Sequence, residues 1–457
     1  MAVYSYATAT GARFAPLQAV EDLVQSSPVV FPQSPGSLDW LLGPALQELE
    51  QSEDAFQLAV FAPAGARDLP VMVFLPGGGF VSGAGTVRWY NAQNFADTQR
   101  AVVVVVNYRV GLLAHRGRVG GGNTVPEELL LALRWVQRHI GTLGGNAENV
   151  TLAGQSAGAF WAFTLAQLEE ARGLFQRVYF GSLSFQPPMS EQEAAQRQAL
   201  VTEHLGERGL ETVTTAQLLS TASGIGKHWA GRGLGLYPSA DQAVPADLFD
   251  AGAAASRLHV DQVMLSHTAD EATAFIGQAP DQAFPEPAVH GFIGAHFADP
   301  DIVAEVFAED QSLVTAKDRM IRAMTLHQIE LYATELADAV AAAGKQSHVV
   351  RFSVVSELPK ARSAHCFELP FAFANAQHWE DAPMLRGLDP ETYDEASTQF
   401  SSLLGSFLKD GIPADTQGNP LPAHQVGTVE ARQVTGSGVQ DHRLERRLTT
   451  KRLAPIR

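Results

Sequence analysis

The sequence predicts an α/β fold in which helices flank a largely parallel central sheet. Two short apolar runs, Val71–Leu75 and Val102–Val106, each end at a turn of glycine or polar residues. Such runs suit strands that are buried on both faces, as in a parallel sheet covered by helices. A helical pattern follows the second run, and a third short run, Val150–Ala153, follows that helix. This alternation of strand, helix and strand is typical of a doubly wound sheet with right-handed crossovers.

The first clear helix is predicted to begin at Thr124. The sequence Thr124-Val125-Pro126-Glu127 has the spacing of a capping box, with Thr124 as the N-cap and Glu127 reaching back to it. Apolar residues then recur at helical spacing as far as Ile140, and Gly141 ends the pattern. Upstream, the second half of residues 52–63 alternates with a period of two and predicts a strand.

Beyond residue 160 the pattern is weaker but continues in the same manner. Short strands are predicted at Val178–Phe180, Val263–Leu265 and His348–Phe352, and helices at Asp318–Ala343 and Ser397–Leu408. Segments of mixed helix and loop at roughly 185–235 and 280–325 are expected to form a helical cap. The polar tail from Val434 is expected to be a solvated helix.

The chain is long enough for two or three average domains or for one large α/β domain with insertions, and we expect a single domain spanning residues 1–457. There are no internal repeats and no low-complexity linker in the 457 residues. A formal net charge of -17 argues against non-specific binding to nucleic acid or to an anionic membrane. The single cysteine, Cys366, excludes an intrachain disulfide, and no apolar span approaches membrane length. We therefore expect a cytoplasmic protein.

The stretch Gly154-Gln155-Ser156-Ala157-Gly158 carries the strongest functional signal. It lies between the third apolar run and a helical segment, and a serine with glycine two residues away on each side is the nucleophile-elbow pattern. The tight turn strains the serine backbone, and larger side chains at the glycine positions would collide with the adjoining strand and helix. Ser156 is therefore the candidate nucleophile.

A serine nucleophile needs N–H donors for an oxyanion, a base, and an acid that orients the base. Gly77-Gly78-Gly79 directly follows a strand, and the N–H of Ala157 adds a donor from the elbow. His365 is the preferred base among 14 histidines, because it lies late in the chain in a loop after a strand. Asp270 and Glu271 both follow the Val263–Leu265 strand, so either carboxylate could be the acid.

Taken together and in order, these motifs resemble the type-B carboxylesterases, the α/β-hydrolase family that includes bacterial para-nitrobenzyl-type esterases and the cholinesterases. The resemblance covers roughly residues 5–415 and rests on Gly11–Pro16, Ser52–Asp54, Pro70–Gly83, Asn107–Arg109, Trp135–Phe160, Asp270–Glu271 and His365–Leu369. It implies Ser156 as nucleophile, Glu271 as orienting acid and His365 as general base and acid.

The same resemblance places the backbone N–H groups of Gly78, Gly79 and Ala157 in an oxyanion hole. It also implies that Arg13 and Glu53 form a structural ion pair. Gln155 stands where many members of the family have glutamate, which removes a negative charge beside the nucleophile and disfavours cationic substrates. Ala272 replaces the glycine that commonly follows the acid, so Asp270 remains an alternative to Glu271.

These observations predict a serine carboxylesterase that hydrolyses neutral, fairly apolar esters through an acyl-enzyme. No metal or organic cofactor is required, and the expected partner is a small-molecule ester. Phe80, Phe160 and Trp161, with Gln155, are candidates for the substrate-binding wall. Two other readings are an amide or carbamate hydrolase with the same three residues and a catalytically silent relative used for protein binding.

Overall fold

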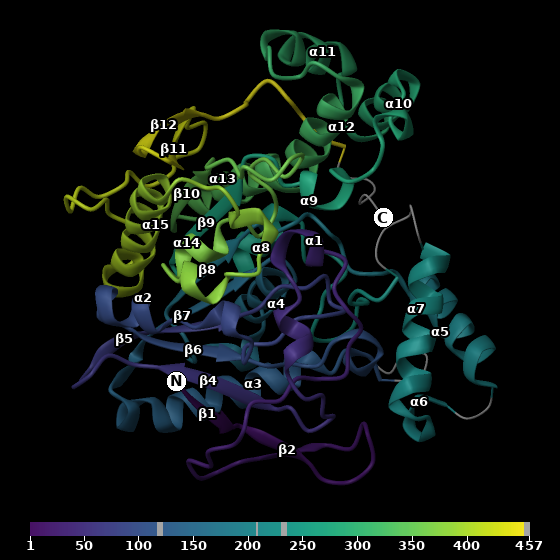
Figure 1. Cartoon of the computed structure of the whole chain (residues 1–457), viewed down its shortest axis with the longest axis vertical. Coiled ribbons are helices and arrows are strands. Elements are labelled where there is room, and N and C mark those ends of the chain that lie inside the picture. Colours follow the sequence, from purple (N-terminus) through teal and green to yellow (C-terminus); the bar gives the residue numbers. More distant parts are fainter. Residues whose placement is uncertain (117–121, 207–208, 230–234, 452–457) are drawn as a thin grey trace.

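The computed structural model describes residues 1–116, 122–206, 209–229 and 235–451. Within them, ten strands form one twisted sheet in the order β1-β4-β6-β5-β7-β8-β9-β10-β11-β12 (Figure 1). Neighbouring strands from β6 to β11 run parallel, and the pairs β1/β4, β4/β6 and β11/β12 are antiparallel. This arrangement is the helix-flanked, largely parallel sheet that the sequence predicts.

The strands of the sheet are β1 (Ala2–Ser5), β4 (Gln57–Phe61), β5 (Leu69–Leu75), β6 (Val102–Val106), β7 (Gly145–Gln155), β8 (Arg177–Gly181), β9 (Gln262–Thr268), β10 (Gln346–Phe352), β11 (Glu430–Thr435) and β12 (Gly438–Arg443). Strands β2 (Ala7–Ala9) and β3 (Leu17–Ala19) form a separate antiparallel pair.

The α-helices of the described residues are α1 (Asp39–Leu42), α2 (Gln93–Gln99), α3 (Val125–His139), α4 (Ala157–Ala166), α5 (Glu191–Leu205), α6 (Gly209–Thr212), α7 (Thr215–Trp229), α8 (Ala251–Arg257), α9 (Thr273–Ile276), α10 (Glu286–His296), α11 (Pro300–Glu309), α12 (Ala316–Thr325), α13 (Leu331–Ala342), α14 (Leu369–Ala372) and α15 (Pro390–Asp410). Short 3₁₀ turns lie at Ala45–Glu48, Arg88–Tyr90, Gly111–Ala114, Ile140–Leu143, Glu169–Ala171, Asp281–Ala283, Ala376–His378 and Pro383–Leu385.

Strand β6 shows why a run of valines marks the centre of this sheet. Val102, Val104 and Val106 belong to a core cluster that includes side chains of α3, α4, α8 and α13. Val103 and Val105 belong to a second cluster, which includes side chains of α2, α14 and α15. Successive side chains of a strand point to opposite faces. The sheet is therefore buried on both faces by two sets of helices.

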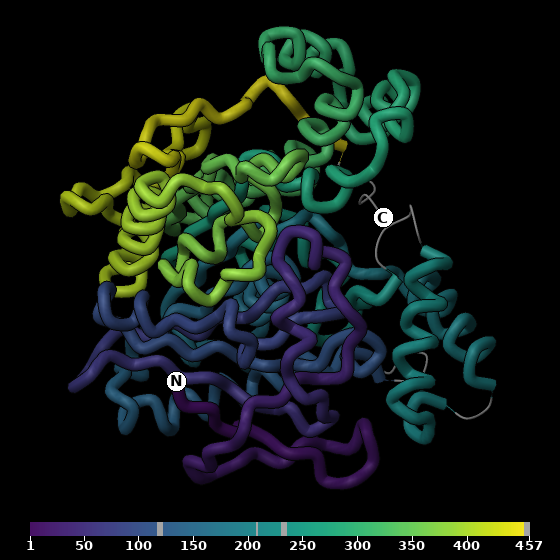
Figure 2. The backbone as a smooth tube through the Cα atoms, viewed as in Figure 1, coloured from purple at the N-terminus to yellow at the C-terminus, as the bar shows by residue number. Residues whose placement is uncertain are grey.

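Two groups of helices project from this body, as Figures 1 and 2 show. One consists of α5, α6 and α7, and the other consists of α10, α11 and α12. The second group has its own apolar cluster, which includes Val289, Phe297 and Phe307. Both groups lie in the segments for which the sequence predicts cap insertions.

An ion pair joins the amino-terminal segment to the first projecting group. Nε and Nη2 of Arg13 each donate to Glu53 at 2.7 Å, as the family resemblance implies. Arg13 also donates to the Leu210 carbonyl in α6, and the Thr215 hydroxyl in α7 donates to Glu53 at 3.1 Å. The pair therefore has a structural role at the junction of these segments.

The prediction of a capping box at Thr124 is wrong. Thr124 does precede α3, but its side chain makes no cap hydrogen bond and its hydroxyl donates to the Leu113 carbonyl at 3.2 Å. Glu127 instead pairs with Arg116. A buried carbonyl of the preceding turn competes for the hydroxyl, so the helix begins with Pro126 in its first turn and without a side-chain cap.

The expectation of a terminal helix beyond Val434 is also wrong. Strands β11 and β12 form a hairpin there, and β11 pairs in parallel with β10. The hairpin lies at the edge of the sheet and is mostly polar, so it lacks the apolar alternation by which a half-buried strand is recognised.

The helix predicted over Asp318–Ala343 is interrupted rather than continuous. A π-helical segment, Leu326–Glu330, separates α12 from α13. Within it Glu330 is buried and accepts from Arg322 at 2.6 and 3.0 Å. Such segments rotate the residues that follow them by part of a turn, an effect that hydrophobic spacing alone does not reveal.

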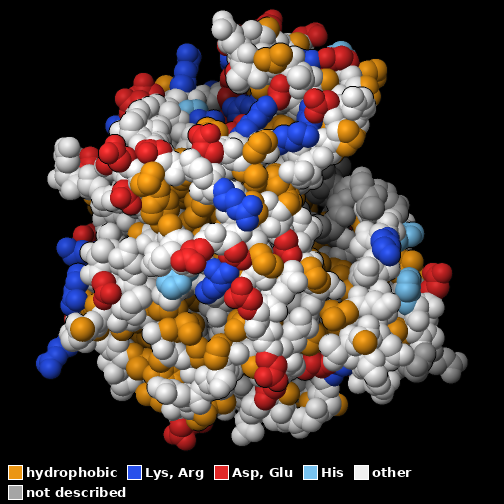
Figure 3. Space-filling view, in the orientation of Figure 1, with side chains coloured by type: hydrophobic (Ala, Val, Ile, Leu, Met, Phe, Trp, Pro, Cys, Tyr) orange, Lys and Arg blue, Asp and Glu red, His pale blue; other side chains and the backbone are white. Residues whose placement is uncertain are grey.

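The face of the molecule shown in Figure 3 carries acidic and basic side chains interspersed with apolar ones. In the part of the chain that the structure describes, no helix has both the length and the apolar character needed to cross a bilayer.

Candidate active site

The residues singled out by the sequence meet at the carboxyl ends of neighbouring parallel strands. The glycine-rich loop follows β5, Ser156 follows β7, Glu271 follows β9, and His365 lies in the loop after β10. In the sheet, β7 lies between β5 and β8, and β9 and β10 follow on the β8 side. Crevices at this edge are where open α/β sheets bind ligands.

The backbone at Ser156 is strained in the manner that a nucleophile elbow requires. Ser156 has φ 57° and ψ −122°, a conformation that L-residues rarely adopt. A Cβ on Gly154 would lie 2.3 Å from the Gly158 carbonyl oxygen, and one on Gly158 would lie 1.9 Å from that of Leu75. Only glycine fits at either position, so the close packing of β5, β7 and α4 fixes the turn.

Ser156, His365 and Glu271 form one continuous hydrogen-bonded line. His365 Nε2 lies 2.7 Å from Ser156 Oγ, and His365 Nδ1 lies 2.5 Å from Glu271 Oε2. The residues His365 and Glu271 are each only 1% exposed, whereas Ser156 is partly accessible. The structure thus brings together three side chains that lie far apart in the sequence.

Asp270 takes a different position from Glu271. Its carboxylate accepts from the Ser363 backbone N–H at 3.4 Å and lies 3.9 Å from the Arg362 guanidinium. Of the two carboxylates that the sequence left open, the geometry therefore brings Glu271 to the imidazole.

Two further groups hold the Glu271 carboxylate in place. Its Oε1 accepts from the Ser182 hydroxyl and from the Thr268 backbone N–H, each at 2.7 Å. Ser182 is fully buried and directly follows β8. Sequence reasoning missed Ser182, although its position after the strand at Val178–Phe180 places it at the same edge of the sheet.

The electrostatics of the pair favour a charged imidazolium beside a charged carboxylate. Burial alone would lower the pKa of His365, but the Cys366 sulfur and the Glu271 carboxylate raise that pKa well above its ordinary value. Burial alone would raise the pKa of Glu271, but the adjacent imidazole lowers that pKa below its ordinary value. These neighbours therefore stabilise the imidazolium that forms once His365 has taken the proton of Ser156.

A second buried carboxyl group, Glu368, lies behind this line. Its Oε1 is 3.5 Å from the Ser182 hydroxyl oxygen, and its Oε2 has no partner among the described residues. Burial, and then the nearby Glu271 carboxylate, raise the pKa of Glu368 to about 7. Two adjacent buried carboxylates cannot both ionise cheaply, so Glu368 stays protonated to a higher pH than Glu271 does.

This arrangement predicts a pH-dependent effect of Glu368→Gln on stability. The folded-state pKa of Glu368 is raised above its unfolded-state value. The contribution of this carboxyl group to the free energy of unfolding is therefore greatest below the unfolded-state pKa, and it is lost as the pH rises through the folded-state pKa. Glutamine stays neutral. The melting temperature of Glu368→Gln relative to the parent protein should therefore be higher at pH 8 than at pH 5, as measured by thermal unfolding.

Exposed Glu357 provides the matched control. Glu357→Gln should show the same difference from the parent at both pH values. A Glu368→Gln variant that lost stability on going from pH 5 to pH 8 relative to the parent would contradict a protonated Glu368.

The glycine-rich loop lies against the serine. A Cβ on Gly77 would be 3.0 Å from the Cβ of Ser156, and Gly78 and Gly79 have φ of 136° and 59°. The backbone N–H groups of Gly78, Gly79 and Ala157 donate to no described residue. Unused N–H donors beside a nucleophile can bind a developing oxyanion, which is the role that the sequence predicts for them.

The aromatic residues near the elbow pack mainly against one another. Phe80, Phe160 and Trp161 are each at most 4% exposed, and the Phe80 ring centroid lies 5.2 Å from that of Phe160 and 6.1 Å from that of Trp161. The Gln155 Nε2 lies 3.4 Å from the Cys366 Sγ and 3.5 Å from His365 Nε2. Their contact with substrate remains a prediction.

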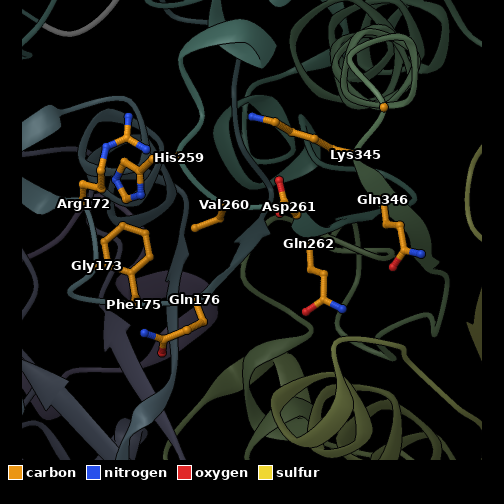
Figure 4. A pocket seen from close by; sticks show the side chains of 11 residues that line it. Arg172, Gly173, Phe175, Gln176, His259, Val260, Asp261, Gln262, Lys345 and Gln346 are labelled. Carbon is orange, nitrogen blue, oxygen red and sulfur yellow. The ribbon is translucent and has the colours of Figure 1, made fainter.

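A separate depression lies at the opposite, amino-terminal edge of β9 and β10. It has a volume of about 730 Å³ and is lined by residues that include Arg172, His259 and Lys345 (Figure 4). Each of these groups already has a protein partner. Arg172 donates to Glu169 at 2.7 and 2.8 Å, His259 Nε2 contacts the Leu165 carbonyl at 3.0 Å, and Lys345 donates to the Ala255 carbonyl at 3.1 Å. The geometry of this depression therefore does not indicate a catalytic site.

The sheet topology, the elbow and the serine–histidine–glutamate line together define an α/β-hydrolase with the side-chain arrangement of a serine hydrolase. Comparison with known proteins identifies the family within this fold. Residues 17–224 match the model of the carboxylesterase family. A probable N-octanoylanthranilate hydrolase of Rhodococcus erythropolis is 30% identical over 425 residues, which cover 88% of this chain and 87% of that protein.

The para-nitrobenzyl esterase of Bacillus subtilis is 28% identical, over 83% of this chain and 78% of that protein. A solved structure of a thermophilic para-nitrobenzyl esterase superimposes with a TM-score of 0.79 at 26% identity, covering 96% of this chain and 93% of the other. The chain belongs to the carboxylesterase family and is a carboxylic ester hydrolase.

Proposed function

We propose that the protein hydrolyses neutral, fairly apolar carboxylic esters, with Ser156 as nucleophile, His365 as general base and acid, and Glu271 as the orienting acid. The observation that carries this proposal is the line from Ser156 Oγ to His365 Nε2 at 2.7 Å and from His365 Nδ1 to Glu271 Oε2 at 2.5 Å. Hydrogen-bonded contact among nucleophile, base and orienting group is the signature of activated nucleophilic catalysis.

The first half of the reaction transfers the acyl group to the enzyme. His365 Nε2 takes the proton of Ser156 as Oγ forms a bond to the ester carbonyl carbon. The carbonyl oxygen becomes an oxyanion that accepts from the N–H groups of Gly78, Gly79 and Ala157. Collapse of this intermediate breaks the bond to the leaving oxygen, which receives the proton from His365 and departs as the alcohol.

The second half returns the enzyme to its starting state. His365 removes a proton from water, and the resulting hydroxide adds to the acyl carbon of the ester on Ser156. The same N–H groups bind the second oxyanion. Breaking the bond to Oγ then returns the proton to Ser156 and releases the carboxylic acid. Glu271 remains ionised throughout and stabilises the imidazolium formed in each half.

The character of the site supports an uncharged substrate. Gln155, next to the nucleophile, is neutral, and its amide contacts Cys366 and His365. A cationic alcohol would therefore lack an ionic partner at this position. The ester reading agrees with the name of the Bacillus subtilis relative, para-nitrobenzyl esterase.

Amide or carbamate hydrolysis on the same three residues is a second candidate. The name of the Rhodococcus erythropolis relative, N-octanoylanthranilate hydrolase, describes cleavage of an N-acyl bond. Rates for an ester, an amide and a carbamate with the same acyl and aryl parts would rank the three activities. A binding protein without activity is disfavoured, because Ser156, His365 and Glu271 are all present and in contact.

We place this reaction in the cytoplasm as a single-domain enzyme whose partner is the small-molecule substrate. The single cysteine, Cys366, is buried and needs no oxidising compartment. The two projecting groups of helices are proposed as the cap of the active site.

Labelling of the nucleophile tests the proposed function directly. We expect short-chain p-nitrophenyl esters to be turned over, and an organophosphate to inactivate the protein with one label per chain on the peptide that contains Ser156. Unfolded protein serves as the control and should take up no label, because the hydroxyl is activated only by the folded site. Absence of both turnover and labelling in folded protein would rule the proposal out.

A further inference from the structure

Arg362, three residues before His365, has a backbone conformation that is unusual for arginine. Its φ is 54°, in the left-handed region that glycine adopts readily and arginine rarely. Strained residues of this kind persist only where the surrounding structure holds them, and they cluster at functional sites. Glycine would be the residue of least cost at this position. The strain therefore points to a use for the Arg362 guanidinium group.

The guanidinium group of Arg362 pairs with a helix of the second projecting group. Nη2 donates to Oδ1 of Asp318, a residue of α12 that is only 8% exposed. The other carboxylate oxygen, Oδ2, accepts from the Thr315 backbone N–H at 2.7 Å and from the Thr315 hydroxyl at 2.8 Å. Exposed ion pairs contribute little, but here the carboxylate is buried and each of its oxygens has a separate partner.

The residues that flank Arg362 join its loop to the turn after β9. The Thr273 hydroxyl donates to the Ala361 carbonyl at 2.7 Å. The Asp270 backbone N–H donates to the Ser363 carbonyl at 2.9 Å. The loop of the histidine, the turn of the acid and helix α12 therefore meet at one junction, and Arg362 lies at its centre.

This junction is close to the imidazole. Only Ser363 and Ala364 separate Arg362 from His365, and both are at most 1% exposed. A closely packed interior transmits displacements rather than absorbing them. A catalytic group that is misplaced by about 1 Å can lose about a hundredfold in rate. A small shift at Arg362 is therefore expected to reach the reacting atoms.

From this geometry we infer that Arg362 is a positioning residue, whose ion pair with Asp318 holds the His365 imidazole in line with the nucleophile and the acid. The inference rests on the proposed function and names a further residue on which that function depends. It also links the α10–α12 group to the reaction, because a shift of α12 moves Asp318 and, through Arg362, the histidine loop.

Arg362→Gly removes the guanidinium group and the backbone strain together. Well below the melting temperature, kcat per active site titrated with an organophosphate should fall about tenfold, the effect of a displacement of less than about 1 Å. His365 acts in both halves of the reaction, so acylation and deacylation should slow by the same factor, and KM should stay within about twofold of the parent value. The melting temperature should stay within about 3 °C, because relief of strain offsets loss of the ion pair.

Lys360→Gly is the matched control. Lys360 is an exposed residue of the same loop with φ 70°, and it makes no ion pair with any residue that the structure describes. Glycine at this position relieves strain and loosens the same backbone without removing a charged contact. The kcat of Lys360→Gly should therefore match the parent value, and a loss equal to that of Arg362→Gly would overturn the inference.

Asp318→Asn tests the partner. Asparagine keeps an acceptor oxygen for Thr315 but presents an NH₂ group to Arg362, so kcat should fall by a similar factor. The double variant should lose no more than either single variant, because both changes break the same contact. Losses that multiply in the double variant would overturn the inference. So would a parent-like kcat per titrated site in Arg362→Gly, which a purely structural ion pair predicts. Absence of turnover by the parent protein would instead contradict the proposed function.

Discussion

Ser156→Ala should lower kcat for ester hydrolysis by about six orders of magnitude, the loss seen when a serine nucleophile of this kind is removed. Among the described residues, the Ser156 hydroxyl is the oxygen that lies against His365 Nε2, at 2.7 Å, so without it no acyl-enzyme forms. Steady-state rates with a p-nitrophenyl ester measure the effect, provided that the variant is purified free of parent enzyme.

The same variant should fold normally. Alanine keeps the Cβ, so the backbone at φ 57° is no more strained than before, and the serine side chain makes no helix-cap hydrogen bond that would be lost. A melting temperature within a few degrees of the parent, together with loss of organophosphate labelling, completes the expected result. Activity comparable to that of the parent would show that Ser156 is not the nucleophile.

Glu271→Gln should lower kcat by about four orders of magnitude, as amide replacement of the orienting acid does in a related arrangement. The Ser182 hydroxyl and the Thr268 N–H both donate to Oε1 and require an acceptor there. The amide NH₂ is therefore turned toward His365 Nδ1. The imidazole proton is then forced onto Nε2. A protonated Nε2 can no longer accept the proton of Ser156.

Asp270→Asn is the matched control for this change. Asp270 contacts the Ser363 N–H and lies near Arg362 rather than the imidazole. The kcat of Asp270→Asn should therefore stay within a few-fold of the parent value. A large loss of kcat in Asp270→Asn with little loss of kcat in Glu271→Gln would show that Asp270, and not Glu271, is the orienting acid. Both variants should be compared by kcat and by melting temperature, because each change removes a charge that is buried or half-buried.

The parts of the fold that leave a mark on a short stretch of sequence could be predicted from the sequence. The valines of β6 are recognisable because both faces of the strand are buried. The elbow is recognisable because Gly154 and Gly158 have no room for a side chain. The β11–β12 hairpin is not recognisable in the sequence, because its partly exposed, polar residues carry no apolar alternation.

The parts of the site that depend on tertiary contact could not be predicted in the same way. Ser182 and Glu368 are common residue types without a motif of their own, and their significance comes from packing behind Glu271. The choice between Asp270 and Glu271 likewise depends on which carboxylate the turn after β9 aims at the imidazole.

The carboxyl-terminal hairpin affects the active site although it lies in a distant part of the sequence. Strand β11 covers the outer edge of β10 through the parallel pairs Val350 with Arg432 and Phe352 with Val434. Truncation of the chain before residue 430 would leave β10 as an unprotected apolar edge, which promotes aggregation with other copies. It would also remove lateral support from the strand that leads to the His365 loop.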